Sequence, residues 1–162
     1  GIFLSVFRRD KWMKNLNVLN SELIADTNVW SNFDNTCTHP KVLSSAFKNS
    51  KAYVCTEPLS INLVGEREWL SLYEFIEIIR IPELLDFYRS IGMPFYKYLI
   101  CKNFSLRNFT NYLVKVFLGG KKTGAHYIKI EKNVLFNLYF PNVYFSIFYY
   151  LFRVLKRKLN IN

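Results

Sequence analysis

The sequence lacks the short motifs by which most enzymes and metal proteins are recognised. It contains no GxGxxG or P-loop nucleotide motif, no GxSxG nucleophile elbow and no HExxH zinc motif. Its three cysteines, Cys37, Cys55 and Cys101, form no CxxC pair and no metal-ligand spacing with either histidine. We therefore expect reduced thiols that are buried as small apolar groups, as in a cytosolic protein.

Acidic residues are almost missing from the second half of the chain. Residues 1–90 contain 10 Lys and Arg against 11 Asp and Glu, whereas residues 91–162 contain 12 against a single acid, Glu131. The net charges are thus −1 and +11, which sum to the +10 of the whole chain. This asymmetry predicts an acidic partner surface, either nucleic acid or anionic lipid.

Charge of either sign is missing from residues 134–152, a run dominated by aromatic and aliphatic side chains. A straight helix of this length would nearly cross a hydrocarbon core of about 30 Å. However, Pro141 and Asn142 interrupt the run, and seven of its 19 residues are Tyr, Asn or Ser. We therefore predict two short amphipathic pieces, 134–140 and 143–159, that lie in the membrane interface. The cations expected to reach the lipid phosphates are Arg153, Lys156, Arg157 and Lys158.

The composition of this run also bears on two other interpretations. Its aromatic side chains could pack on the first half of the chain as core. Nucleic-acid binding is not expected, because a stacking surface interleaves cations with aromatic rings, whereas here the cations flank an uncharged run.

Apolar periodicity predicts an α/β region followed by helices. Short apolar or alternating runs predict strands at 2–7, 52–55 and 59–64. Helical spacing predicts helices at 10–24, 38–47, 71–80, 82–91 and 94–118, with a polar loop at 25–38. We place the boundary between the α/β part, 1–79, and the mainly helical, membrane-associating part, 80–162, at the end of the helix predicted over 71–80.

Several segments together resemble a known enzyme family. Residues 3–12 (FLSVFRRDKW) combine a strand with an Arg–acid–x–Trp element, and residues 38–47 (THPKVLSSAF) lead into KAYV as a helix before a strand. These segments resemble the second half of family 2 glycosyltransferases, most closely the O-antigen sugar transferases of the abequosyltransferase type. The likeness continues through residues 58–63, 65–69, 80–83 and 98–103.

This resemblance implies the second, acceptor-binding half of a GT-A fold. The donor half would then lie upstream of Gly1, together with the Asp-x-Asp ligands of a divalent metal, Mg or Mn. The chain would be a fragment, inactive alone, of an enzyme that moves a sugar from a nucleotide-sugar donor to a lipid-linked glycan acceptor. That reaction belongs to O-antigen and surface-polysaccharide synthesis at the cytoplasmic face of the bacterial inner membrane, where the enzyme would be peripheral. The alternative function is a non-enzymatic membrane-surface binding module.

The resemblance also suggests site residues. The family carries an acidic pair at the start of the helix, and the chain has Thr38 and His39 at that position, so either His39 or Asp34 of the preceding loop is the expected base. The residues expected to bind the acceptor are Trp30, Asn35 and Thr36. Further contacts to the diphosphate or acceptor are expected from Arg8, Arg9, Arg67, Glu68 and Trp69. The charged members of this set are equally typical of ordinary surface clusters.

Overall fold

The computed structural model describes residues 8–28, 30–51 and 68–159, and within these ranges every regular element is helical. The predicted α/β class is therefore wrong for the described part of the chain. Residues 9–50, expected to belong to a GT-A half, form helices and turns because their apolar residues recur at helical spacing and asparagines cap the ends. The three predicted strands, 2–7, 52–55 and 59–64, lie outside the described residues.

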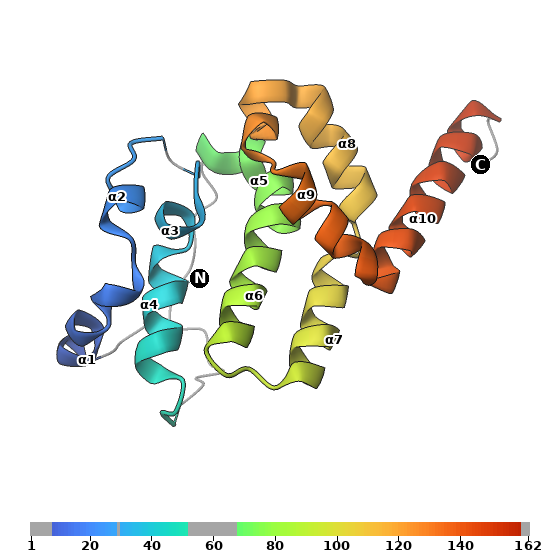
Figure 1. The fold of residues 1–162 in the computed structure, drawn as a ribbon. Coiled ribbons are helices and arrows are strands. Elements are labelled where there is room, and N and C mark those ends of the chain that lie inside the picture. The colour runs from blue at the N-terminus through green and yellow to red at the C-terminus, as the bar shows by residue number, and fades with distance from the viewer. Residues whose placement is uncertain (1–7, 29, 52–67, 160–162) are drawn as a thin grey trace, which may run out of the picture.

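The α-helices are short and closely connected, apart from the last. In chain order they are α1 (Arg9–Lys14), α2 (Ser21–Ile24), α3 (Phe33–Thr36), α4 (Thr38–Phe47), α5 (Tyr73–Phe75), α6 (Ile81–Ser90), α7 (Phe95–Ser105), α8 (Phe109–Gly119), α9 (Ile130–Asn133) and α10 (Pro141–Lys158). Between them lie η2 (Leu16–Val18), η3 (Glu68–Leu72), a π-helical turn η4 (Ile76–Arg80), η5 (Gly120–Thr123), η6 (Ala125–Tyr127) and η7 (Leu135–Tyr139). In Figure 1, α1 to α4 lie at one end, α5 to α9 in the middle and α10 at the other end.

The single helix predicted over 10–24 is broken by two asparagines. The Asn15 side chain donates to the carbonyl of Lys11 at 2.9 Å, just where α1 ends. The Asn20 side chain accepts from the backbone N–H of Glu22 at 2.9 Å and so starts α2. Asparagine side chains compete with the helix backbone in this way, which favours caps over helix interiors. The helix predicted over 38–47 is confirmed as α4, with Pro40 in its first turn.

The predicted boundary at residue 79 falls inside a continuous helical stretch. Helix α5 passes through the π-turn η4 into α6 without a break. Ile78, Ile79 and Arg80 of that turn are all buried. Because these three side chains are buried, the chain lies in the interior of the molecule at the predicted boundary.

The long helix predicted over 94–118 is two helices. The chain turns at residues 106–108 between α7 and α8, where Leu106 is fully buried. A buried apolar cluster joins this corner to α5, η4, α8 and the start of α10, through Phe75, Ile78, Ile79, Leu106, Phe109, Val116, Phe140 and Val143. Helical spacing continues through residues 94–118, yet the chain turns where Leu106 is buried. The sequence alone does not show that this turn is buried.

Candidate functional site

Trp30, expected to stack on a sugar, has an unusual backbone conformation. Its φ of 74° lies in the left-handed region, which is strained for a bulky side chain and persists only where neighbours hold it. The neighbour is Arg80, whose Nη2 donates to the carbonyl oxygens of Trp30 and Ser31, each at 2.8 Å. The polar loop is thus fastened to the start of α6.

Arg80 is a buried cation that joins the loop to the central helices. Its Nη1 pairs with Oε2 of Glu83 at 2.6 Å, and its guanidinium lies 4.9 Å from the centre of the Phe75 ring. Oε1 of Glu83 accepts from Nδ2 of Asn133 in α9 at 3.2 Å. The sequence offered a signal that was missed: an arginine and a glutamate one helical turn apart, directly after the mainly apolar run 75–79.

The other two residues expected to bind an acceptor hold the loop together. Nδ2 of Asn35 donates to the carbonyl of Asn28 at 3.0 Å, while its backbone N–H bonds the Asn32 side chain at 3.0 Å in a capping box. The Thr36 hydroxyl donates to the carbonyl of Asn32 at 2.7 Å. These polar atoms therefore stabilise α3 in the structure as it stands.

Asp34, one of the two candidate bases, is buried and fully engaged. Its Oδ1 accepts from Nζ of Lys41 at 2.7 Å, and its Oδ2 accepts from the backbone N–H of Asn20 at 2.6 Å. The Lys41 ammonium also lies about 5.5 Å from the Phe87 ring. Asp34 of α3 thus connects to Lys41 of α4 and to the cap of α2, and loss of one partner would leave a buried charge uncompensated.

His39, the other candidate base, is exposed in the first turn of α4. Its ring centroid lies 5.5 Å from that of Trp12, with the planes tilted by 39°. Arg8 and Arg9 are also exposed. Arg8 pairs with Asp10 at 2.9 Å, and its hydrogen bond lowers the pKa of that carboxyl group. None of these contacts joins His39 to Asp34 as a catalytic pair.

The remaining predicted contacts cannot be placed. Arg67 lies outside the described residues. The backbone of Glu68 and Trp69 begins η3, and their side chains lie outside the described part of the structure.

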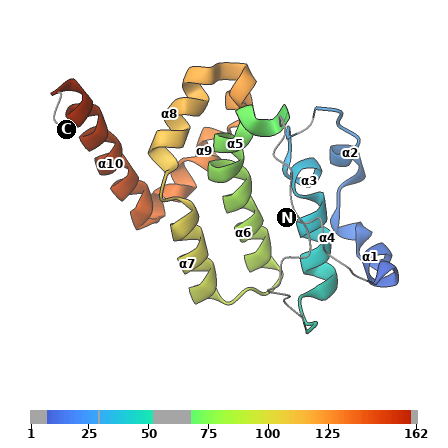
Figure 2. The same cartoon turned by 180° about the vertical axis from the view of Figure 1, so that it is seen from behind.

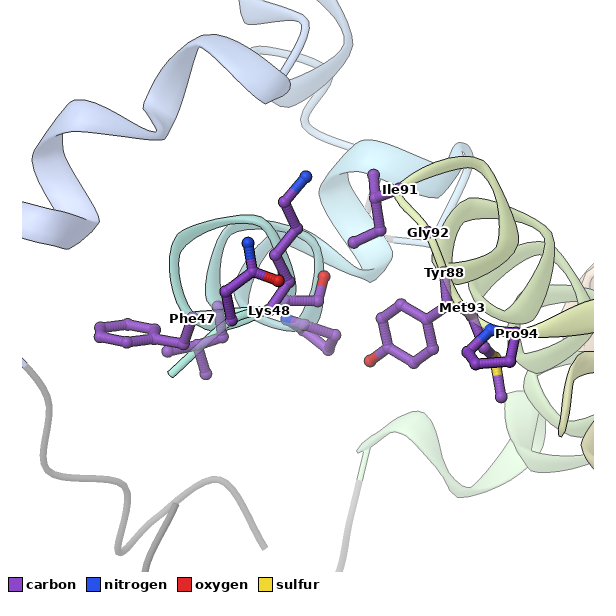
Figure 3. Close-up of a pocket in the computed structure, with 11 residues that line it drawn as sticks. Phe47, Lys48, Tyr88, Ile91, Gly92, Met93 and Pro94 are labelled. Atoms are coloured by element: carbon purple, nitrogen blue, oxygen red, sulfur yellow. The ribbon is translucent and has the colours of Figure 1, made fainter. Parts of the chain in front are cut away.

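A hollow of about 800 Å³ lies between α4 and the turn that joins α6 to α7 (Figure 3). Its lining is mainly apolar and consists of Pro40, Leu43, Ser44, Phe47, Lys48, Asn49, Tyr88, Ile91, Gly92, Met93 and Pro94. Partial burial raises the pKa of the Tyr88 hydroxyl. Among the described residues, this lining includes neither a carboxylate nor a histidine, and neither candidate base, His39 or Asp34, is part of it.

The metal implied by the family resemblance finds no match in the described residues. Within 8–28, 30–51 and 68–159, no group of three or more His, Cys, Asp or Glu side chains could hold an ion. Mg and Mn bind through clustered oxygen ligands. The family resemblance places the ligands of this metal outside the chain, so their absence from the described residues leaves that expectation a prediction.

The second half of the molecule contains a different kind of candidate site, the long helix α10. Two polar contacts fix its beginning. The backbone N–H of Asn142 donates to Oδ1 of Asn103 at 2.9 Å, and Nδ2 of Asn142 donates to the carbonyl of Asn103 at 2.7 Å. One turn later, Oγ of Ser146 accepts from the backbone N–H of Thr110 at 3.1 Å. Both views show the rest of α10 pointing away from the other helices (Figures 1 and 2).

The side of α10 that points away from the body is apolar. Val143 and Ser146 are buried against the body, and Tyr150 and Val154, one and two turns further on, are half-buried. On the opposite side, Phe145, Phe148 and Phe152 are 67%, 69% and 63% exposed, with Leu155 and Leu159 continuing the stripe. This arrangement reverses the usual amphipathic helix, whose apolar stripe faces the core. No helix in the described residues is long and apolar enough to cross a membrane.

Cations without carboxylate partners surround this region. Of the 12 Lys and Arg after residue 90, three pair with acids of the first half: Lys102 with Asp86, Lys115 with Glu74 and Lys132 with Glu83. In the described part of the chain, the other nine form no ion pair: Lys97, Arg107, Lys121, Lys122, Lys129, Arg153, Lys156, Arg157 and Lys158.

Compared with known proteins, the chain matches no family model, no curated protein sequence and no solved structure.

Proposed function

We propose that this protein binds the surface of membranes that carry negative charge, and that α10 is its main contact. The observation that carries the proposal is the outward stripe of Phe145, Phe148, Phe152 and Leu155, which ends in the basic turn 156–158. A helix with an apolar face and a basic end binds in the plane of the membrane interface.

The energies favour this partner over water. A Phe or Leu side chain contributes roughly 1.5–3 kcal/mol when it is fully removed from water, and less at an interface. Each Lys or Arg near an anionic leaflet contributes about 1 kcal/mol. The alternative that the aromatic run forms core describes its first part, where Phe140 and Val143 join the buried cluster, whereas most of α10 beyond Ser146 is exposed.

Flotation with vesicles tests the proposal. We expect the chain to float with vesicles of equal parts phosphatidylcholine and phosphatidylglycerol at about 0.1 M salt, and to float poorly with phosphatidylcholine alone. Binding should weaken but persist in high salt, since the apolar stripe does not depend on charge. A chain that ignores anionic vesicles but retards RNA in a gel would contradict the proposal and favour a nucleic-acid partner.

Sugar transfer is a second candidate function, although the described residues do not form the α/β fold expected for such an enzyme. The observation in its favour is the left-handed backbone of Trp30, since strained residues cluster at binding and catalytic sites. Such an enzyme would use a nucleotide-sugar donor and a lipid-linked glycan acceptor, and attachment through α10 would raise the local concentration of the acceptor.

Membranes from cells that express the chain would be incubated with labelled nucleotide sugars. Label that enters lipid and is lost in His39→Ala supports transfer with His39 as base. Transfer unchanged in His39→Ala rejects His39 as the base, and absence of transfer shows that this chain alone does not suffice for the activity.

A further inference from the structure

A second apolar ridge lies on α7, on the side of that helix that faces away from the core. Tyr96, Ile100 and Phe104 are spaced four residues apart, which places them on one face of the helix, and they are 62%, 66% and 62% exposed. The opposite face carries Tyr98 and Lys102, which contact Asp86 of α6. Helix α7 therefore has a buried side against α6 and an apolar side without a partner in the described residues.

The α7 ridge meets the start of α10. Leu99, Ile100 and Asn103 of α7 share a hollow of about 400 Å³ with Tyr139, Phe140 and Pro141. Leu135 and Phe136 of η7 are exposed next to this junction in sequence. In both views α10 begins beside the end of α7 (Figures 1 and 2).

The junction is held firmly enough to fix the two helices relative to each other. Asn103 bonds both the backbone N–H and the side chain of Asn142, at 2.9 and 2.7 Å. Beneath it, the Lys102 ammonium is ion-paired with Asp86 and lies 5.5 Å from the Phe140 ring. A surface that touches α10 near Pro141 would thus also meet α7.

We infer that α7 and α10 together form one membrane-docking surface for anionic lipid, so that the protein attaches through two joined apolar ridges in a single orientation. This inference rests on the proposed function and adds the second ridge and the fixed orientation. Charge identifies the partner: cations border both ridges, with the Arg107 guanidinium 4.1 Å from the Phe104 ring and that of Arg153 5.7 Å from the Tyr149 ring. Anionic headgroups complement these cations.

A second copy of the chain is the competing occupant of these ridges. It would bring two halves of charge +11 together, with one acid in each. Like charges across an interface oppose association. A lipid surface has no such cost.

Fluorescent labels on the two ridges test the inference. In a Cys55→Ser, Cys101→Ser background, which keeps the buried Cys37, an environment-sensitive nitrobenzoxadiazole group would be attached at Ile100→Cys, Phe148→Cys or, as a control in the first half, Met13→Cys. With the phosphatidylglycerol vesicles above, we expect emission at positions 100 and 148 to rise about threefold and shift to the blue, because both enter the apolar part of the interface. Position 13 should not change.

The outcomes separate the inference from the proposed function. A response at 148 without one at 100 overturns the joint surface but leaves attachment through α10 intact. No response at either position overturns both. A blue shift at both positions without vesicles, with a doubled mass in sedimentation, overturns the lipid partner in favour of a second copy.

An affinity measurement supplies an independent readout. Ile100→Asp should weaken vesicle binding about tenfold, the equivalent of about 1.4 kcal/mol, while Leu70→Asp, an exposed apolar position in the first half, should leave it unchanged. Equal affinities for the two variants would overturn the role of α7.

Discussion

The described residues before and after position 90 place their apolar side chains in opposite ways. Twenty large apolar side chains are exposed between 91 and 159, against five before position 91. The first region balances its charges and buries ion pairs such as Asp34–Lys41 and Arg80–Glu83. The second leaves nine cations without a carboxylate partner in the described residues. The difference is that the first region pairs most of its charges internally, whereas the second leaves apolar and cationic side chains exposed, as the proposed membrane contact requires.

The largest expected effect concerns the buried polar contacts of the first region. Arg80→Met removes the closer cation of Glu83, leaving only the longer pair with Lys132 at 3.7 Å, and releases the carbonyls of Trp30 and Ser31. Removing one member of a buried pair typically costs about 3–5 kcal/mol, and we expect that loss in the free energy of unfolding measured with urea. As a control, Lys115→Met breaks the exposed pair with Glu74, for which we expect about 0–1 kcal/mol. Similar losses in both variants would contradict the distinction.

The basic end of α10 should matter to binding but not to folding. Replacing Lys156, Arg157 and Lys158 by Gln should weaken binding to anionic vesicles by about 2–3 kcal/mol at low salt, at about 1 kcal/mol for each cation. The matched variant replaces Lys14, Lys48 and Lys51, which are exposed in the first region, and should bind as the parent does. The gap between the two should close in high salt. If both variants bound the vesicles equally weakly, binding would depend on the net charge of the protein and not on the basic end of α10.

The sequence predicted features that depend on neighbouring residues and missed those that depend on distant ones. The sequence predicted the basic, aromatic character of residues 134–158 and the break at Pro141, because proline position and charge patterning act locally. In the structure η7 ends before Pro141 and α10 begins there. The reversed orientation of the apolar stripe was not predicted, since it depends on Asn103 and Thr110, which hold α10 from 39 and 36 residues away. The roles of Arg80 and Asp34 were missed for the same reason: Arg80 bonds the backbone 50 residues earlier, and such pairing is invisible to local patterns.

A single charge placed on the outward stripe should have a smaller effect. Leu155→Asp removes an apolar side chain and adds a negative charge that anionic lipid repels, so we expect vesicle binding to weaken by about 1.5–2 kcal/mol. Leu70→Asp makes the same change at a comparably exposed position of the first region and should have no effect. Unchanged flotation of Leu155→Asp would remove α10 from the contact.

The smallest expected effect separates two thiols. Burial raises the pKa of Cys37 to about 12, whereas Cys101 on α7 is exposed. At pH 9 the buried Cys37 thiol should stay mostly neutral, so alkylation followed by peptide mass spectrometry should modify Cys101 and spare Cys37. Because the raised pKa keeps the thiol neutral, Cys37 should gain reactivity only in denaturant. Rapid alkylation of Cys37 in the native protein would show that α3 and α4 open readily.

Hydrogen exchange with and without anionic vesicles compares the two regions in one experiment. If the second region docks on lipid while the first stays in water, peptides from α7 and α10 gain protection and peptides from residues 8–51 exchange as before. Unchanged exchange in α10, or protection confined to residues 8–51, would contradict membrane attachment through the C-terminal helices.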